Sequence, residues 1–419
     1  MVTAYLVGAT VTMPLWGRAS DLHGRKALFL AAIAVFLAGS ALSGVAGSLG
    51  QLIAFRALQG TGAGGLMTLA MAIVAEIVSP RERGRYQGYI QMVFVVASVA
   101  GPLLGGLFAD HLSWRWVFYI NLPIGAAALA LIMGALRLPD RREPARVDYL
   151  GGALLAAALT CILLVTTWGG REYAWGSAEI AGLAAAVLLL TGAFAARERS
   201  APEPLLPLRL FREPVFVVVS AALFLAMLAF FAVIVFMPIY LQVVKGVSAT
   251  ESGLLLLPML LTGLASTALA GRAISRTGRY KAFPVAGLGL MAAGLLGLSL
   301  IGTHTSLVTI GLVLVVFGIG FGMVTQVLTI AIQNAVDRRD LGIATASANL
   351  FRALGGSFGV ALFGSVFASR LGTDPEHLQG VGAGEVASAL HTVFLIGAPV
   401  ALLGLLVVLT LREIPLRTA

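Results

Sequence analysis

Thirteen apolar stretches follow one another along this chain, most of them long enough to cross a lipid bilayer as a helix. A hydrocarbon core of about 30 Å needs roughly 20 apolar residues in helical form. The chain is 59% hydrophobic and only 11% charged, with mean hydropathy +0.96, so it has too little polar surface for a soluble fold. We expect an all-α polytopic membrane protein. The stretches lie at about 1–16, 27–47, 51–77, 87–108, 116–136, 149–167, 178–196, 215–240, 250–270, 282–302, 307–332, 342–368 and 389–411.

Basic residues gather in alternate connections between these stretches, and they account for the net charge of +9. The opposite connections hold little beyond Arg115, Arg171, Lys245 and Arg370. This asymmetry is typical of the positive-inside rule and of contact with anionic lipid headgroups. It predicts a multi-pass protein of the cell membrane with a cytoplasmic C-terminus, and it argues against nucleic acid as a partner. The basic set is Arg81, Arg83, Arg85, Arg137, Arg141, Arg142, Arg146, Arg197, Arg199, Arg209, Arg212, Arg272, Arg276, Arg279 and Lys281.

One short basic segment occurs twice. The first copy runs from Gly17 to Lys26 and the second from Gly271 to Lys281, and each follows an apolar stretch of membrane length. Such an echo indicates that one membrane unit is built twice, as in two-halved transporters. We expect both copies to be glycine-bounded loops.

The repeat predicts three regions: an N-terminal bundle at 1–136, two additional central helices with linkers at 137–214, and a six-helix C-terminal bundle at 215–419. With six helices in each half and two between them, the second basic segment should follow the tenth helix. It follows the ninth visible one. We therefore expect one helix of the first half to be missing at the N-terminus.

Motifs of soluble enzymes and metal proteins find no support here. Cys161 stands alone inside an apolar stretch, and the five histidines lack metal-ligand spacing, so no metal site is expected. Gly60–Gly65 and Gly355–Gly359 match a dinucleotide and a nucleophile pattern, but both lie inside apolar helices rather than at strand–helix turns. We expect no enzyme and no cofactor.

Several motifs resemble the major facilitator superfamily, and in particular its fourteen-helix drug:proton antiporter branch. Gly17-x-x-x-Asp21-x-x-Gly24-Arg25-Lys26 looks like the family's loop between helices 2 and 3. Arg56-x-x-Gln59-Gly60 is similar to its helix-4 motif, and Gly101-Pro102-x-x-Gly105-Gly106 to its antiporter motif. The stretch from Trp114 to Gly125 resembles the entry to helix 6. The family's first helix, which carries a membrane-embedded Asp, has no counterpart.

The resemblance implies three sets of functional residues. Asp21 helps to latch helix ends in one conformation, although it can also cap the following helix or lie in a solvated turn. A charge such as Arg56 costs roughly 3 kcal/mol at the bilayer centre, so it faces a cavity unless it snorkels to the interface. The latch comprises Gly17, Asp21, Gly24, Arg25, Lys26, Gly271, Arg272, Gly278 and Arg279. The proton or substrate path comprises Arg56, Gln59, Gly60, Asn349 and Arg352. The gating helix carries Gly101, Pro102, Gly105 and Gly106.

A substrate cavity is expected along the axis between the two bundles. Aromatic and methionine side chains with few polar groups suit bulky amphipathic compounds, because adaptable apolar surfaces accept varied shapes. An aromatic stripe is also what a packed helix core looks like. The cavity candidates are Tyr5, Met13, Phe231, Phe236, Tyr240 and Gln326.

These features predict a monomeric secondary transporter that exports hydrophobic or amphipathic small molecules in exchange for protons. One proton moving down about 100 mV releases roughly 2.3 kcal/mol, and no ATP-binding P-loop is present. By resemblance, the proton-carrying carboxylate belongs to the missing helix. Two alternatives stay open: a facilitator or symporter of the same fold that imports a small solute, and a membrane sensor or scaffold without transport.

Overall fold

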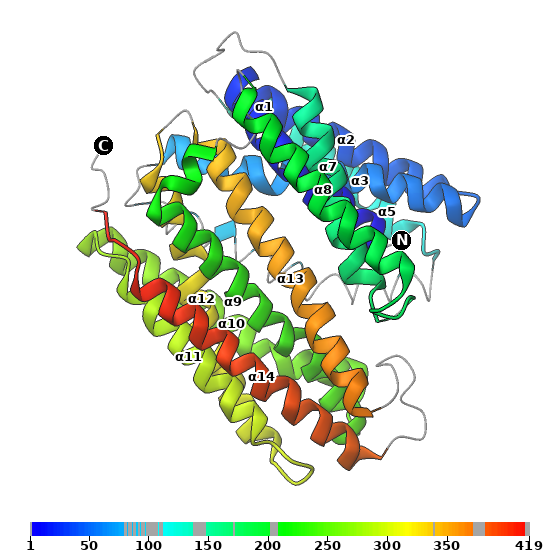
Figure 1. Ribbon diagram of the computed structural model, residues 1–419, viewed down its shortest axis with the longest axis vertical. Coiled ribbons are helices and arrows are strands. Elements are labelled where there is room, and N and C mark those ends of the chain that lie inside the picture. The colour runs from blue at the N-terminus through cyan, green and yellow to red at the C-terminus, as the bar shows by residue number, and fades with distance from the viewer. Residues whose placement is uncertain are drawn as a thin grey trace.

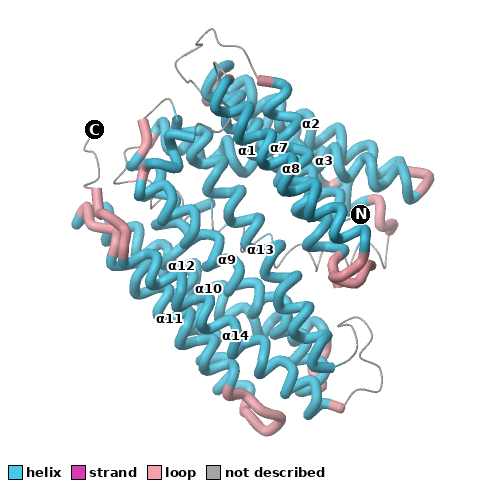
Figure 2. The backbone as a smooth tube through the Cα atoms, viewed as in Figure 1, coloured by secondary structure: helices cyan, strands magenta, loops and turns pink. Residues whose placement is uncertain are grey.

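The computed structural model describes residues 2–78, 112–136, 148–170, 172–201, 208–337, 340–371 and 382–414, together with residues 82, 86, 89, 90, 93, 97 and 108. Over these residues the chain is helical, and short loops join the helices (Figure 2). The described part holds no strand, only one isolated bridge between Gly169 and Tyr173. The prediction of an all-α fold is confirmed.

The helices follow the predicted apolar stretches to within a few residues at most ends. The first half contains α1 (Val2–His23), α2 (Arg25–Val45), α3 (Leu49–Ile77), α5 (Trp116–Tyr119) and α6 (Asn121–Ala135), and α7 (Tyr149–Trp168) and α8 (Ala178–Ser200) follow. The second half contains the short helix η1 (Leu208–Arg212), α9 (Pro214–Ile239), the π-helical turn η2 (Tyr240–Val244), α10 (Ala249–Thr277), α11 (Ala282–Ser299), α12 (Leu307–Ala335), α13 (Leu341–Leu371) and α14 (Ala383–Leu409).

Eleven helices among the described residues are long and apolar enough to cross a membrane. Helix α1 is not one of the eleven, and the predicted stretch at 87–108 lies mostly outside the described residues. The predicted number of thirteen spans is therefore an approximate one.

The two basic segments are helical rather than looped, so that prediction is wrong. Helix α1 continues through Gly17 to His23, and α10 continues through Gly271 to Thr277. Each helix ends where one glycine adopts a positive φ, 92° at Gly24 and 69° at Gly278. Glycine adopts this positive-φ conformation readily, whereas residues with a side chain avoid it. We call the end of the molecule formed by residues 17–26 and 271–281 the basic end.

The helices form two groups. Figure 1 shows α1, α2, α3, α5, α7 and α8 in one group and α9–α14 in the other. Within the first group α3 packs against α1 and α2, and within the second α12 packs in the same way against α10 and α11. Helices α1, α3 and α7 of the first group all contact α13 of the second.

The repeat extends to single contacts between helices. Helices α3 and α12 both have 29 residues, and a serine caps the start of each, Ser48 and Ser306. A Cβ added at Gly60 would meet the Tyr5 carbonyl oxygen at 2.2 Å, and one at Gly318 would meet the Met259 oxygen at 2.2 Å. Both glycines allow close backbone approach between neighbouring helices. The two halves are therefore copies of one packing arrangement.

Helices α7 and α8 form a hairpin, and α7 attaches it to the rest of the molecule. The Asp148 side chain accepts a bond from Gly151 N at the start of α7 and is paired with Arg197 of α8 at 3.0 Å. Helix α7 then contacts α1 and α13. The turn between the helices is tied to α13, because Trp175 Nε1 donates to Ser365 Oγ at 3.0 Å. The three-region division of the chain stays a prediction.

Candidate functional site

A cavity of about 510 Å³ lies between the two groups of helices. It extends along α13 from Asn349 to Ser365, away from the basic end. Helices α1, α3, α7, α9 and α13 supply its described lining residues: Leu6, Thr10, Met13, Met67, Thr166, Thr167, Gly169, Gly170, Met227, Phe231, Asn349, Arg352, Ala353, Gly356, Ser357, Val360, Ala361, Gly364 and Ser365. The site is of a size to hold a small molecule.

The cavity wall is mainly apolar, with a few polar groups set into it. Three methionines, Met13, Met67 and Met227, come from three different helices, and Phe231 adds an aromatic face. Unbranched thioether side chains adapt to ligands of different shape. Such a wall binds a compound chiefly through its apolar body.

Arg352 brings the only charge among the described lining residues. Its Nη2 donates to the Thr325 carbonyl oxygen and to Thr329 Oγ1, both at 2.5 Å, and its Nη1 donates to Asn349 Oδ1 at 3.3 Å. These bonds hold the guanidinium between α12 and α13 while the residue stays partly exposed. Asn349 is nearly buried, at 3% exposure.

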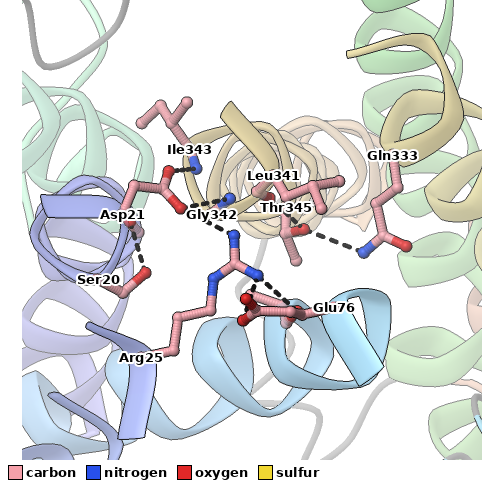
Figure 3. A network of polar contacts seen from close by, with 11 residues as sticks. Ser20, Asp21, Arg25, Glu76, Gln333, Leu341, Gly342, Ile343 and Thr345 are labelled. Carbon is pink, nitrogen blue, oxygen red and sulfur yellow. Dashed lines mark hydrogen bonds and ion pairs between the residues drawn. The ribbon is translucent and has the colours of Figure 1, made fainter. Parts of the chain in front are cut away.

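The basic end is closed by a contact between α1 and α13 that centres on Asp21 (Figure 3). Its Oδ1 accepts from Gly342 N at 3.1 Å and its Oδ2 from Ile343 N at 3.0 Å. Both N–H groups belong to the first turn of α13, where no carbonyl of the same helix can pair with them. The carboxylate also lies where the dipole of α13 favours negative charge. Asp21 therefore caps α13, and the expectation that it caps the following helix is wrong.

Arg25 completes this cluster and joins three helices of the first half. Its Nη2 donates to Asp21 Oδ1 at 3.0 Å, and its Nη1 donates to Glu76 Oε2 of α3 at 2.8 Å (Figure 3). The Asp21 side chain is only 3% exposed. Burial raises the pKa of Asp21 to about 6, although Arg25 and the backbone amides of Ile343 and Gly342 lower it.

Glycines allow the two helices to meet at this contact. A Cβ added at Gly17 would lie 2.5 Å from the Ala346 Cβ and 2.8 Å from the Gly342 carbonyl oxygen. A Cβ added at Gly342 would lie 2.4 Å from Asp21 Oδ1 and 2.6 Å from the Gly17 oxygen. Any side chain at either position would push α1 and α13 apart.

The second basic segment has a different arrangement. Ser275 takes the place of Asp21 in the repeat, and its Oγ donates to the Gly271 carbonyl oxygen of its own helix at 2.8 Å. Arg272 and Arg279 are exposed, and Gly278 forms the left-handed end of α10. The structure thus shows a carboxylate-centred contact between the groups at the first segment, while the second segment carries a hydroxyl there.

Arg56 and Gln59 lie together, apart from the described lining of the cavity. Arg56 Nη1 donates to Gln59 Oε1 at 2.7 Å, and Gln59 Nε2 donates to Ser40 Oγ at 3.0 Å. The guanidinium stands over the Tyr5 ring, 4.2 Å from its centroid, so Tyr5 packs on Arg56 instead of lining the cavity. Gly60 faces the backbone of α1.

Among the other predicted cavity residues, Met13 and Phe231 line the cavity, whereas Phe236, Tyr240 and Gln326 do not. Phe236 packs on Phe367 with ring centroids 5.6 Å apart, and Tyr240 is fully buried with its hydroxyl donating to the Gly302 oxygen at 2.8 Å. For these two aromatic residues the packed-core interpretation applies. Helical spacing alone does not say which face of α9 is turned to its neighbours.

Sequence reasoning missed the contribution of α7. Thr166, Thr167 and the glycines at 169 and 170 line the cavity, although α7 lies outside the repeated halves. The pair of adjacent threonines near the end of an apolar helix was the only available signal. The expected gating residues Gly101, Pro102, Gly105 and Gly106 lie outside the described residues.

Comparison with known proteins agrees with this architecture. The sequence profile of the Major Facilitator Superfamily matches residues 1–360. MFS-type transporter Rv1877 of Mycobacterium tuberculosis (strain ATCC 25618 / H37Rv) is 40% identical over 99% of this chain, which spans 64% of that relative's length. The multidrug transporter protein MdtP of Bacillus subtilis (strain 168) is 35% identical over 89% of this chain and 69% of its own.

A solved structure shows the same fold. The human organic anion transporter MFSD10 (TETRAN) superimposes with a TM-score of 0.65 over 95% of this chain and 82% of its own, at 19% sequence identity. At this identity the likeness concerns the fold alone. Together with the apolar helices, the family match indicates a multi-pass membrane protein. The chain belongs to the Major Facilitator Superfamily.

Proposed function

We propose that this protein exports hydrophobic or amphipathic small molecules in exchange for protons, by alternating access between its two bundles. The observation that carries the proposal is the apolar cavity between the bundles, which lies beyond a contact that closes the basic end. The relative named as a multidrug transporter supports a drug-like substrate. A monomer provides both bundles and is the proposed functional unit.

In this proposal the structure represents the state whose cavity faces away from the cytoplasm. Asp21, Gly17 and Gly342 form the latch of that state, because they hold α1 against α13 only while the basic end is closed. Opening the basic end would expose the first turn of α13 and the Asp21 carboxylate to water. Closure of the opposite end would then involve α13 and the α7–α8 turn, joined at Trp175 and Ser365.

Exchange for protons is the second part of the proposal. None of the described residues that line the cavity is a carboxylate. Asp21 titrates near neutral pH, but it lies in the latch and not in the cavity. The proposal therefore assigns the proton-binding group of the transport cycle to a residue outside the described lining, in keeping with the embedded carboxylate that the family resemblance implies.

The test is transport by the purified protein in proteoliposomes. The probes are Nile red, ethidium and anilinonaphthalene sulfonate, which are neutral, cationic and anionic. With an acidic lumen, we expect uptake of at least one dye that stops when nigericin collapses the pH gradient. If the protein carries dyes but none of the fluxes depends on the pH gradient, proton exchange is overturned. If no dye shows protein-dependent flux, transport itself is overturned.

A matched pair of variants links transport to the cavity. Ala361→Phe places a ring in the cavity, and Gly192→Phe places the same ring on α8, where a Cβ meets nothing within 4 Å. We expect the first to lower uptake at least tenfold at equal protein content, and the second to leave it unchanged. Equal uptake by both variants would show that substrate takes another path.

A further inference from the structure

Arg352 is a half-buried cation without a carboxylate partner in the described part of the chain. Other arginines of the described part do have carboxylate partners: Arg25 pairs with Asp21 and Glu76, Arg197 with Asp148, and Arg209 with Asp340. Arg352 lies about 16 Å along α13 from Leu341, since the helix rises by roughly 1.5 Å per residue. It is therefore deep within the membrane-spanning part. Charged residues at such a depth cost free energy to insert into the bilayer and mark functional sites.

The hydrogen bonds of Arg352 satisfy only part of its guanidinium. Five N–H groups are available in an arginine, and the bonds to Thr325, Thr329 and Asn349 use three of them. The Nε atom is buried and lacks a hydrogen-bond partner among the described residues. The same holds for Asn349 Nδ2 on the adjacent turn of α13. A buried donor that remains unpaired costs about 1–3 kcal/mol.

Arg352 and Asn349 line the cavity, whose other described polar side chains carry hydroxyl groups. Thr10, Thr166 and Thr167 face it from the first half and the hairpin, and none of its described lining residues is Asp or Glu. The local charge is therefore positive and uncompensated. A cationic ligand would be repelled there, because charges interact strongly where water is excluded.

We propose that Arg352 and Asn349 form an acceptor site for the oxyanion of an amphipathic substrate, with the apolar body of that substrate lying against Met13, Met227 and Phe231. This inference rests on the proposed export function and names its substrate class: organic carboxylates and sulfonates with a bulky apolar part. A planar guanidinium fork matches the geometry of an oxyanion and forms charge-assisted hydrogen bonds with it.

A purely structural role for Arg352 is the competing interpretation. The bonds to Thr325 and Thr329 join α12 to α13, and a neutral donor at Nη2 would satisfy them equally well. They do not require a permanent charge next to a cavity. The binding test therefore compares two ligands that share one aromatic body and differ in the presence of a sulfonate group.

The experiment measures equilibrium binding of anilinonaphthalene sulfonate and of N-phenylnaphthylamine, which has the same aromatic body without the sulfonate. The full chain is reconstituted in phosphatidylcholine nanodiscs, and empty nanodiscs correct for partition into lipid. We expect Arg352→Met to weaken binding of the sulfonate about tenfold or more, because one charge-assisted hydrogen bond contributes at least that much to affinity. Binding of the neutral compound should change by less than about twofold.

Two further variants keep the test decisive. Arg370→Met removes a charge from the exposed end of the same helix and should change neither affinity. Asn349→Ala should also weaken the sulfonate selectively if Arg352→Met fails to fold. An equal loss of affinity for both ligands, or no loss of affinity for the sulfonate, would overturn the acceptor site. If dye transport continues in that case, the proposed export function still stands.

The source of the oxyanion is settled by one additional arm. Phosphatidylglycerol in the nanodiscs presents a lipid phosphate next to an apolar tail, whereas anilinonaphthalene sulfonate is a soluble compound. Displacement of the bound sulfonate by phosphatidylglycerol would identify a lipid as the occupant of the acceptor site. Unchanged binding of the sulfonate would identify a soluble organic anion.

Discussion

At the scale of single residues, Asp21 is an ionisable group held away from water. Its carboxylate accepts bonds from Gly342 N, Ile343 N and Arg25, yet burial prevails and raises its pKa from 3.8 to about 6. Asp21 lies beyond the apolar part of α1, at the basic end. The closed contact therefore holds a proton more tightly than a solvated carboxyl group does.

This raised pKa predicts that closure of the basic end depends on pH. Protonation stabilises the closed contact fully below about pH 4, and this stabilisation is lost as the pH rises through about 6. The closed-to-open ratio should fall by up to about a hundredfold over that range, since each pKa unit is a factor of about ten. The measurement is the distance between spin labels at His23 and Arg276, with Cys161 replaced by serine.

Asp21→Asn provides the control for this pH effect. The asparagine keeps a side-chain oxygen that accepts a bond from the first turn of α13, but it carries no titrating group. Its label distances should not change between pH 4 and 7. A pH response in the variant equal to that of the native protein would assign the effect to another residue.

At the scale of helices, the close approach of α1 and α13 is a property of both helices together. Gly17 and Gly342 face each other there, and a Cβ on either would collide with atoms of the opposite helix. Helix packing of this kind needs small residues because the backbones approach closely. The sequence suggests the importance of Gly17 through the repeated basic segment, whereas Gly342 belongs to no motif.

We expect Gly342→Ala to open the basic end. The added Cβ would lie 2.4 Å from Asp21 Oδ1, and overpacking of this kind costs typically about 1–3 kcal/mol. The ratio of open to closed molecules, measured from the distance between labels at His23 and Arg276, should rise by roughly tenfold or more. Gly192→Ala on α8, where a Cβ meets nothing within 4 Å, should leave the distance unchanged. A closed basic end in Gly342→Ala would contradict the latch.

At the scale of the whole molecule, the two bundles repeat one packing arrangement even where their sequences differ. Lys26 Nζ donates to the Leu136 and Met133 oxygens at the C-terminal end of α6, at 2.6 and 3.0 Å. Lys281 Nζ donates to the Leu409 oxygen at the end of α14, at 2.8 Å. Each lysine thus pairs with the last carbonyl groups of the final helix in its own bundle, where the helix dipole favours positive charge.

The repeat predicts equal and independent effects of removing these lysines. Lys26→Met and Lys281→Met should each lower the free energy of unfolding by about 0.5–1 kcal/mol. The double variant should lose the sum to within about 0.5 kcal/mol, because the sites lie in separate bundles. Denaturant unfolding in detergent micelles measures this, with Arg272→Met at an exposed position as control. A clearly non-additive loss would show that the bundles are coupled at these lysines.

The long apolar helices and the internal repeat could be predicted from local sequence alone. Apolar length places a helix in the bilayer whatever its neighbours are, and the segments at Gly17 and Gly271 reveal the repeat through residue identity. The same reasoning placed Arg352 and Asn349 in a polar path, since a charge inside an apolar helix needs a reason to be there.

The partners of these residues were decided only by the tertiary structure. Asp21 could cap its own neighbouring helix or a distant one, and only the packing of α1 on α13 brings Gly342 and Ile343 to it, more than three hundred residues away. Phe236 and Phe231 share one helix, yet one is core and the other faces the cavity. The bilayer makes every helix apolar on all sides, so periodicity cannot tell a lipid-facing side from a packed one. Contacts between helices settle that, because they alone distinguish one apolar face from another.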